Sequence, residues 1–377
     1  MKIACLVPTV VEGQSGVGDQ TLLLISQIQS MGHIGCLIAC AENNIQQPEE
    51  GFIHFGEQKI LSFRLPASMS WPKRWEQIQQ FLEKNSPWDW LSLQFVPYIF
   101  HPRGFVFGLE QHLKQIFSGR WHIMFHETWI GQMKGASWKH RCIGAIQRLS
   151  IQRMVKKLAP QLAHTSMPTY QDLLQNSGIS TRILPLFGNV AVEGFSADQH
   201  FDFIEQNAWH FGIFGTLHPV WASEPLLPYL IEAGKRANRK ILLISIGHLG
   251  YGHSLWKEVQ RKYQNQITFH TLGKLPASKI SQIMQRLDYG ISTTPLQVIG
   301  KSSAGITMLE HGLPLIVNRQ EFYGLPSDSI IPNDPLIIPM TADLPNQLVA
   351  GIPKQPCRSR LPSIAAQWID DLKSAEK

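Results

Sequence analysis

The residues from 300 to 305 combine groups that could bind phosphate. They read Gly-Lys-Ser-Ser-Ala-Gly and lie between a short apolar run and a helix-like segment. Small residues at a helix start leave backbone N–H donors free, and together with a lysine these suit an anionic diphosphate. The candidate ligand-binding residues here are Lys301, Ser302, Ser303 and Gly305.

Two neighbouring positions limit what this segment can be. Pro295 stands where a P-loop requires a glycine, so a nucleotide triphosphatase of that type is not expected. Glu310 follows on the helix-like segment and could accept hydrogen bonds from ribose hydroxyls. An isolated glutamate is more often a solvated or capping residue, and that alternative stays open.

A second glycine-rich loop follows the first apolar run. Gly16 and Gly18 precede the helix-like stretch that begins near Leu22, but Thr21 stands where the dinucleotide fingerprint GxGxxG needs its third glycine. We therefore do not expect an NAD site. Glycines here can let the backbone approach a substrate or a diphosphate closely, and an ordinary tight turn is the alternative.

His126 and Glu127 follow another apolar run, at the expected carboxyl end of a strand. A histidine there could act near a reacting group, although a lone histidine at a strand end is often structural. Glu127 could orient His126 or act on an acceptor itself. The sequence contains no DxD motif and no Cys/His set with zinc spacing, so we expect no metal site.

The elements that must position these residues form two series of apolar runs separated by helix-length segments. This rhythm predicts α/β domains with parallel sheets, whose ligands bind at the carboxyl ends of the strands. The expected strands are 3–7, 34–41, 88–96, 122–125 and 162–166, then 211–215, 241–246, 267–272, 289–292 and 313–317.

The polar stretch between the two series marks a domain boundary. We expect an N-terminal Rossmann-like domain over 1–190, a linker over 191–207 and a C-terminal Rossmann-like domain over 208–360. Residues 361–377 have the spacing of a terminal helix, with one apolar face formed by Ile364, Ala365, Trp368, Ile369 and Leu372.

The string GKSSAGITMLEHGLPLIV, from Gly300 to Val317, resembles the donor-binding segment of GT-B glycosyltransferases, especially family 4. The loop GVGDQTLLL resembles the same family's glycine loop, and the domain rhythm agrees over nearly the whole chain. The resemblance implies the GT-B fold, with two Rossmann-like domains whose parallel sheets face a central cleft.

It also implies a retaining, metal-independent transfer of a sugar from a UDP- or GDP-sugar to a hydroxyl of a polysaccharide, a glycolipid or a small molecule. No cofactor is expected beyond this nucleotide-sugar co-substrate. By resemblance, His126 lies near the reacting sugar, and 1–190 forms the acceptor side. Loops at Gly215-Thr216, Gly247 and Gly273-Lys274 would complete the donor site.

The chain departs from the family pattern at two places. Ser302 stands eight positions before Glu310, where the family has another glutamate, and the stretch after Gly215 lacks the family's arginine and lysine. We expect Lys301 to take over much of the diphosphate neutralisation. The missing cations also fit a non-catalytic partner subunit, and a nucleotide-sugar epimerase on the same scaffold is a further alternative.

Composition limits the partners. The 377 residues carry a formal net charge of +6 with a pI of about 9.0, which favours anionic partners. The five cysteines form no CxxC pair and are expected to be buried thiols in a reducing compartment. Residues 1–11 are expected to form a strand rather than a signal peptide, so we expect a cytoplasmic protein.

The segment from 128 to 171 contains no acidic residue. Apolar side chains are interleaved with its basic ones, as in a helix that meets anionic lipid at the inner face of a membrane. A solvated basic face is the equal alternative, and nucleic acid is not expected because no recognition module accompanies the charge. The basic residues are Lys134, Lys139, Arg141, Arg148, Arg153, Lys156 and Lys157.

Overall fold

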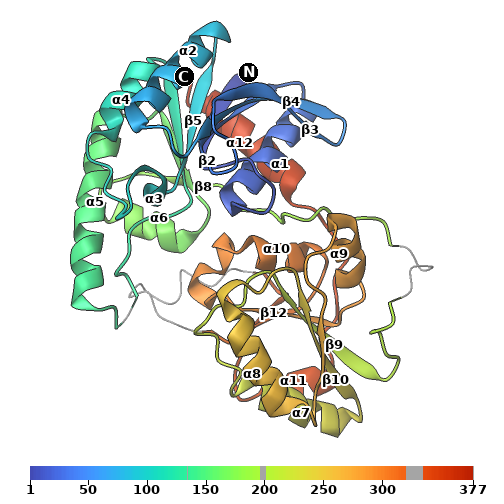
Figure 1. The fold of residues 1–377 in the computed structure, drawn as a ribbon. Coiled ribbons are helices and arrows are strands. Elements are labelled where there is room, and N and C mark those ends of the chain that lie inside the picture. Colours follow the sequence, from blue (N-terminus) through green and yellow to red (C-terminus); the bar gives the residue numbers. More distant parts are fainter. Residues whose placement is uncertain (134, 196–200, 320–333, 377) are drawn as a thin grey trace. The chain divides into compact units, whose positions relative to one another are not determined.

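The computed structural model describes residues 1–133, 135–195, 201–319 and 334–376. These residues form two compact units, each with a central sheet and helices packed against it (Figure 1). Of the described residues, 1–186 and 361–376 belong to unit 1, and 187–319 and 334–360 belong to unit 2. The chain therefore passes from unit 1 to unit 2 and returns to unit 1 for its last helix.

Unit 1 contains an eight-stranded sheet in the order β3-β4-β2-β1-β5-β6-β7-β8. All neighbouring pairs are parallel except β3 and β4, which form an antiparallel hairpin at one edge. The strands are β1 (Lys2–Val7), β2 (Ile34–Glu42), β3 (Glu49–Phe55), β4 (Gln58–Pro66), β5 (Trp90–Phe95), β6 (Arg120–Phe125), β7 (Leu162–Thr165) and β8 (Arg182–Ile183).

Two helices of unit 1 begin at a serine whose side chain accepts a hydrogen bond from a free backbone N–H group. Ser15 caps α1 by accepting from Gly18, and Ser137 caps α5 by accepting from His140. The last helix, α12, buries the apolar face expected from its spacing and packs against α1. The helices are α1 (Gly16–Ser30), α2 (Trp71–Lys84), α3 (Pro97–Phe100), α4 (Leu109–Ile116), α5 (Trp138–Leu158), α6 (Pro168–Gln175) and α12 (Leu361–Ser374).

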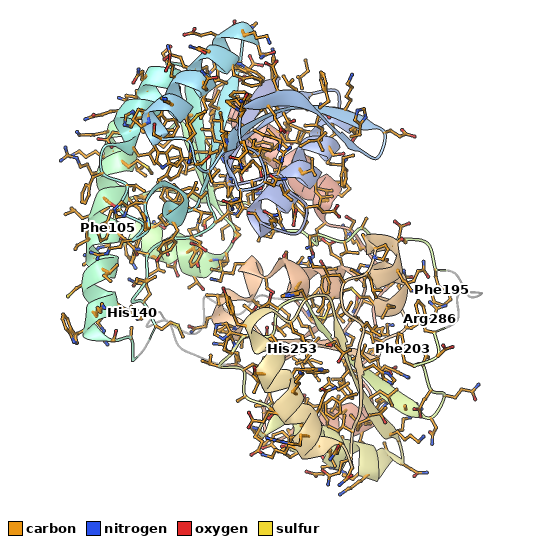
Figure 2. All side chains as sticks on the ribbon, in the orientation of Figure 1. Phe105, His140, Phe195, Phe203, His253 and Arg286 are labelled. Carbon is orange, nitrogen blue, oxygen red and sulfur yellow. The ribbon has the colours of Figure 1, made fainter. Side chains whose placement is uncertain are left out.

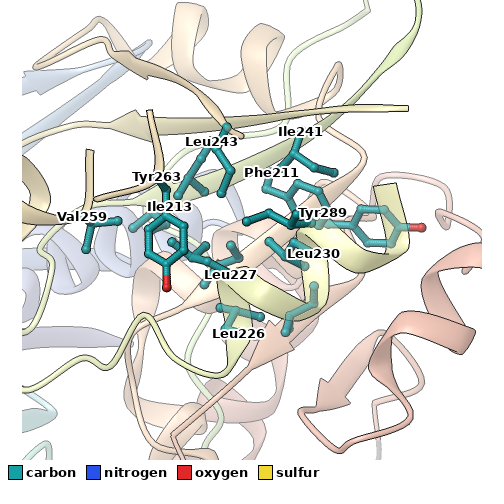
Figure 3. Close-up of a cluster of buried hydrophobic side chains, with 14 of the residues drawn as sticks. Phe211, Ile213, Leu226, Leu227, Leu230, Ile241, Leu243, Val259, Tyr263 and Tyr289 are labelled. Atoms are coloured by element: carbon teal, nitrogen blue, oxygen red, sulfur yellow. The ribbon is translucent and has the colours of Figure 1, made fainter. Parts of the chain in front are cut away.

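Unit 2 contains a six-stranded parallel sheet in the order β11-β10-β9-β12-β13-β14. One of its cores is shown in Figure 3, where Phe211 stacks on Tyr289 with ring centroids 5.1 Å apart. The strands are β9 (Ala208–Phe214), β10 (Lys240–Ile246), β11 (Thr268–Thr271), β12 (Tyr289–Ser292), β13 (Leu315–Val317) and β14 (Ile337–Pro339).

The helical segments of unit 2 follow its strands in the alternation expected of a Rossmann-like domain. They are α7 (Leu226–Ala237), the 3-10 turn η1 (Gly250–Gly252), α8 (His253–Tyr263), α9 (Ala277–Met284), the 3-10 segment η2 (Leu296–Lys301), α10 (Ser303–Glu310) and α11 (Leu344–Ala350).

The expected α/β class with two parallel-sheet domains is confirmed, and every strand expected from an apolar run is present. Two details differ. The sheet of unit 1 carries an antiparallel edge, because β3 and β4 are joined by a tight hairpin. The expectation of five buried thiols is wrong for Cys142 and Cys357, which are exposed, whereas Cys5, Cys36 and Cys40 are buried within strands. Within the described residues, no helix is long and apolar enough to cross a bilayer.

Candidate functional site

Three glycine turns lie side by side at the carboxyl edge of the unit 2 sheet. The Gly215 N–H donates to the carbonyl of Ile246 at 2.8 Å, and the Gly247 N–H donates to the carbonyl of Gly273 at 2.8 Å. Gly215 and Gly247 have φ values of +79° and +89°, a conformation that side chains with a β-carbon rarely adopt. The turns after β9, β10 and β11 are therefore connected into one row of backbone.

The start of α10 lies next to this row. A β-carbon placed on Gly215 would lie 3.6 Å from the β-carbon of Ala304, which is ordinary van der Waals contact. The hydroxyl of Thr293, after β12, donates to the carbonyl of Thr216 at 3.1 Å. Gly215, Thr216, Gly247 and the segment 302–305 are thus brought together, and exposed Lys274 directly follows Gly273.

The backbone donors at the start of α10 are used unequally. Ser302 Oγ accepts a hydrogen bond from the Gly305 N–H at 3.1 Å and so caps the helix. The Gly305 N–H is therefore already used within the protein. The N–H groups of Ser303 and Ala304 have no acceptor within the described part of the chain. Lys301 is exposed at the end of η2, immediately before this cap. These two backbone donors lie beside exposed Lys301, and together they are the candidates for binding an anionic ligand.

Glu310, at the other end of α10, is only 3% exposed. Its Oε1 accepts the Arg360 N–H at 3.0 Å, and the Gly188 N–H also donates to its carboxylate. Burial raises the pKa of Glu310 above its ordinary value, against the lowering effect of these two hydrogen bonds. Glu310 therefore holds together three segments: α10, the start of unit 2, and the stretch that leads back to unit 1.

In unit 1, the glycine loop after β1 is held by buried Glu42. The Glu42 carboxylate accepts from Thr9 Oγ1 at 2.6 Å and from the Val10 N–H at 2.8 Å. Gly18 lies so close to the backbone of Thr9 that a β-carbon on Gly18 would be 2.0 Å from the Thr9 carbonyl oxygen. Gly16 is exposed and has open space around it. Gly18 thus has a packing reason to be glycine, and Gly16 is the accessible glycine of the pair.

His126 lies at the carboxyl end of β6 and is half-buried. The ring Nε2 of His126 is 2.8 Å from Oε1 of Gln94, and the backbone N–H of His126 donates to the carbonyl of Phe95. Burial lowers the pKa of His126 from 6.5 to about 4, so the imidazole is neutral at pH 7. Sequence reasoning missed Gln94. Its signal was a polar residue inside the apolar run of β5.

The described residues contain no group of three or more His, Cys, Asp or Glu side chains arranged to hold a metal ion. Two clusters among the described residues offer groups for chemistry: the glycine turns with α10 in unit 2, and His126 with Gln94 in unit 1. The first can bind an anion through backbone and lysine donors. The second can exchange a proton through a neutral imidazole.

No family model matches the chain, and no curated protein matches it. Solved structures do. Sucrose-phosphate synthase from Thermosynechococcus elongatus superposes with a TM-score of 0.58 at 12% identity, covering 100% of this chain and 95% of that one. The E. coli trehalose-6-phosphate structure bound with UDP-2-fluoro glucose gives a TM-score of 0.57 at 10% identity, covering 100% and 96%.

A third structure, Anabaena Alr3699/HepE in complex with UDP and glucose, gives a TM-score of 0.54 at 15% identity, covering 99% of this chain and 100% of that one. The three likenesses cover at least 95% of each chain and so include both units. At these identities they establish the architecture and leave the chemistry to the residues of this chain. The fold implied by the sequence resemblance is confirmed: the chain has the GT-B fold of two Rossmann-like domains.

Proposed function

We propose that this chain is a glycosyltransferase that moves a sugar from a nucleotide diphospho-sugar to an acceptor hydroxyl, with retention of configuration and without a metal. The observation that carries the proposal is the row of glycine turns beside the start of α10. It places the N–H groups of Ser303 and Ala304, with exposed Lys301 just before them, at the carboxyl edge of a parallel sheet, where such sheets bind ligands.

In this proposal the diphosphate binds the two N–H groups and Lys301. Negative charge grows on the diphosphate as the glycosidic bond breaks, so fixed donors there bind the transition state more strongly than the ground state. Because Ser302 Oγ and the Gly305 N–H bind each other, their role is to hold the start of α10 in place. The backbone near Gly247 and Gly273, with Lys274, is the proposed contact for the nucleobase.

Glu310 takes a positioning role in this proposal. Its carboxylate is buried and already accepts two backbone N–H groups, which favours a fixed support for α10 over the ribose contact considered from sequence. His126 is the proposed residue on the acceptor side. As a neutral imidazole it can accept a proton or a hydrogen bond at pH 7.

Product analysis tests the proposal. The protein is incubated with UDP- and GDP-sugars, with and without a panel of hydroxyl acceptors, and the sugar products are identified. A transferase releases nucleoside diphosphate and forms a new glycoside only when an acceptor is present. An epimerised sugar without acceptor would replace the proposal by the epimerase alternative. Absence of any product across the panel would favour the non-catalytic partner.

We also propose that helix α5 meets an anionic membrane surface. Trp138 is 78% exposed, Leu149 59% and Ile146 43%, while the opposite face of the helix is buried. Figure 2 shows side chains along the outer side of α5, with His140 near the helix N-terminus. Six of the seven basic residues of this segment lie in described positions on α5, and Lys134 lies outside the described residues. Exposed apolar and basic side chains on one face suit interfacial binding.

Vesicle sedimentation tests this surface. Binding to phosphatidylserine-containing vesicles should exceed binding to neutral vesicles and weaken with salt, since each basic residue near the surface contributes about 1 kcal/mol. Trp138→Ala with Leu149→Ala should weaken binding, whereas Tyr251→Ala, which removes a 91% exposed aromatic of unit 2, should not. Equal binding to neutral and anionic vesicles would contradict the proposal.

A further inference from the structure

A continuous line of hydrogen bonds crosses the interior of unit 1 from His126 to the last helix. It uses side chains from three neighbouring strands of the sheet and ends at α12, and the four inner members are at most 3% exposed. The links are His126 Nε2 to Gln94 Oε1 (2.8 Å), Gln94 Nε2 to Ser92 Oγ (2.7 Å), Ser92 Oγ to His122 Nδ1 (2.7 Å), His122 Nε2 to His164 Nδ1 (2.9 Å) and His164 Nε2 to Asp371 Oδ2 (3.1 Å).

The far end of the line fixes the direction of every bond. Asp371 pairs with Arg182 through Oδ1 at 2.6 Å, so its carboxylate presents only acceptor oxygens to His164. His164 must therefore carry its proton on Nε2. Burial lowers the pKa of His164, so its Nδ1 is left as an acceptor and must receive the proton of His122 Nε2.

The same reasoning carries through the remaining links. Burial also lowers the pKa of His122, so its Nδ1 accepts from the hydroxyl of Ser92. Ser92 Oγ then accepts from Gln94 Nε2, and Gln94 Oε1 is left to accept from His126 Nε2. The Cys5 thiol also bonds Ser92, and burial raises its pKa to about 12, so it stays a neutral S–H that fits this pattern.

We propose that Asp371, on the last helix, is a positioning residue that sets the tautomer of His126 through this line. His126 is held with its proton on Nε2 and its lone pair on Nδ1, and Nδ1 has no hydrogen-bond partner within the described residues. That lone pair is the group that would accept a proton or a hydrogen bond during transfer. The catalytic meaning rests on the proposed function, but the tautomer itself does not.

Asp371→Asn should reverse the line. Arg182 can only donate, so it will hold the carbonyl oxygen of Asn and turn the amide NH₂ toward His164. His164 Nε2 must then accept, which moves the proton to Nδ1 and reverses each following bond, with the Gln94 amide flipped. His126 becomes protonated on Nδ1. Asp370→Asn is the matched control, because Asp370 is the neighbouring exposed residue of the same helix.

Nitrogen NMR of the full chain with ¹⁵N-labelled histidine rings measures these tautomers directly, with the His126 signals assigned through His126→Gln. We expect Nε2–H at His126, His122 and His164 in the wild type and after Asp370→Asn, and Nδ1–H at all three after Asp371→Asn. In the double variant Asp371→Asn, Gln94→Leu, the tautomers of His164 and His122 should switch, whereas that of His126 should not follow them. The wild-type spectrum tests the proposal even if a variant fails to fold.

Nδ1–H at His126 in the wild type would overturn the proposal, as would an unchanged His126 when His164 has switched. The kinetic consequence is separate: Asp371→Asn should lower transfer by ~10²-fold, the size of a misplaced acid-base group, with nearly unchanged donor affinity. If the wild type transfers no sugar, the proposed function fails and the tautomer result still stands.

Discussion

The two candidate clusters differ in the kind of group that forms them: backbone in unit 2 and side chains in unit 1. In unit 2, the site consists mainly of backbone: glycine turns after parallel strands and the start of α10, with Lys301 as the charged side chain beside them. In unit 1, His126 depends on a line of buried side chains that extends to Asp371. A site made of backbone donors does not titrate, whereas a line of imidazoles does. Acidification should therefore affect unit 1 more, and changes of glycine should affect unit 2 more.

The largest effect is expected for Lys301→Ala. Removing a fixed donor from a developing negative charge lowers turnover by about 10²–10³-fold. Thermal stability should stay nearly constant, because Lys301 is exposed. Lys257→Ala, an exposed lysine on α8, is the matched control and should leave turnover unchanged. Equal turnover in the two variants would show that the backbone donors act without a cation.

Glu310→Ala should destabilise the protein by about 2–4 kcal/mol, because two backbone N–H groups lose their buried acceptor. Glu310→Gln keeps an oxygen acceptor and should cost less than half as much. Chemical denaturation of both variants measures the difference. If Glu310→Ala left stability intact and abolished nucleotide binding, the ribose role would be favoured over the supporting one.

Stability should fall as the pH falls below 6.5. Burial depresses the pKa of His126 to about 4 in the folded state, so the unfolded chain binds more protons between these values, and the free energy of unfolding rises with pH there. The titration of His126 alone should lower the free energy of unfolding by ~1–2 kcal/mol between pH 7 and pH 5. Denaturation at both pH values should show a smaller difference in His126→Gln. An unchanged difference would assign the pH dependence to other groups.

The smallest effect concerns two glycines, one in each unit. Gly215→Ala forces a β-carbon into a left-handed conformation and should cost about 1 kcal/mol, with weaker nucleotide binding. Gly16→Ala meets open space and should change stability by less than about 0.5 kcal/mol. Thermal melts of the two variants compare them. Equal losses would indicate that the turn after β9 is not the more constrained one.

The sequence predicts the fold well because buried parallel strands consist of consecutive apolar residues, as in β1 and β10. The β3–β4 hairpin escaped prediction because β3 is largely exposed at the edge of its sheet and contains few apolar residues. The edge strands β8 and β14 are only two and three residues long, too short to show a period.

The residues proposed for the site can be picked out in the sequence, whereas their hydrogen bonds cannot. The glycine turns and Lys301 are visible as local patterns. The support given by Glu310 depends on Gly188 and Arg360, which lie far away along the chain, so no local spacing shows it. The same holds for Asp371, whose link to His126 exists only because four segments, β5, β6, β7 and α12, lie next to one another.

Calorimetric titration with UDP, GDP and their glucose and mannose conjugates tests the central claim most directly, because it measures donor binding without needing the acceptor. We predict saturable binding of at least one nucleoside diphosphate and its sugar to the wild type. Binding should weaken at least ~10-fold in Lys301→Ala and stay unchanged in Lys257→Ala. If none of these ligands bound at millimolar concentration, or if wild type and Lys301→Ala bound equally well, the proposed donor site at the start of α10 would be contradicted.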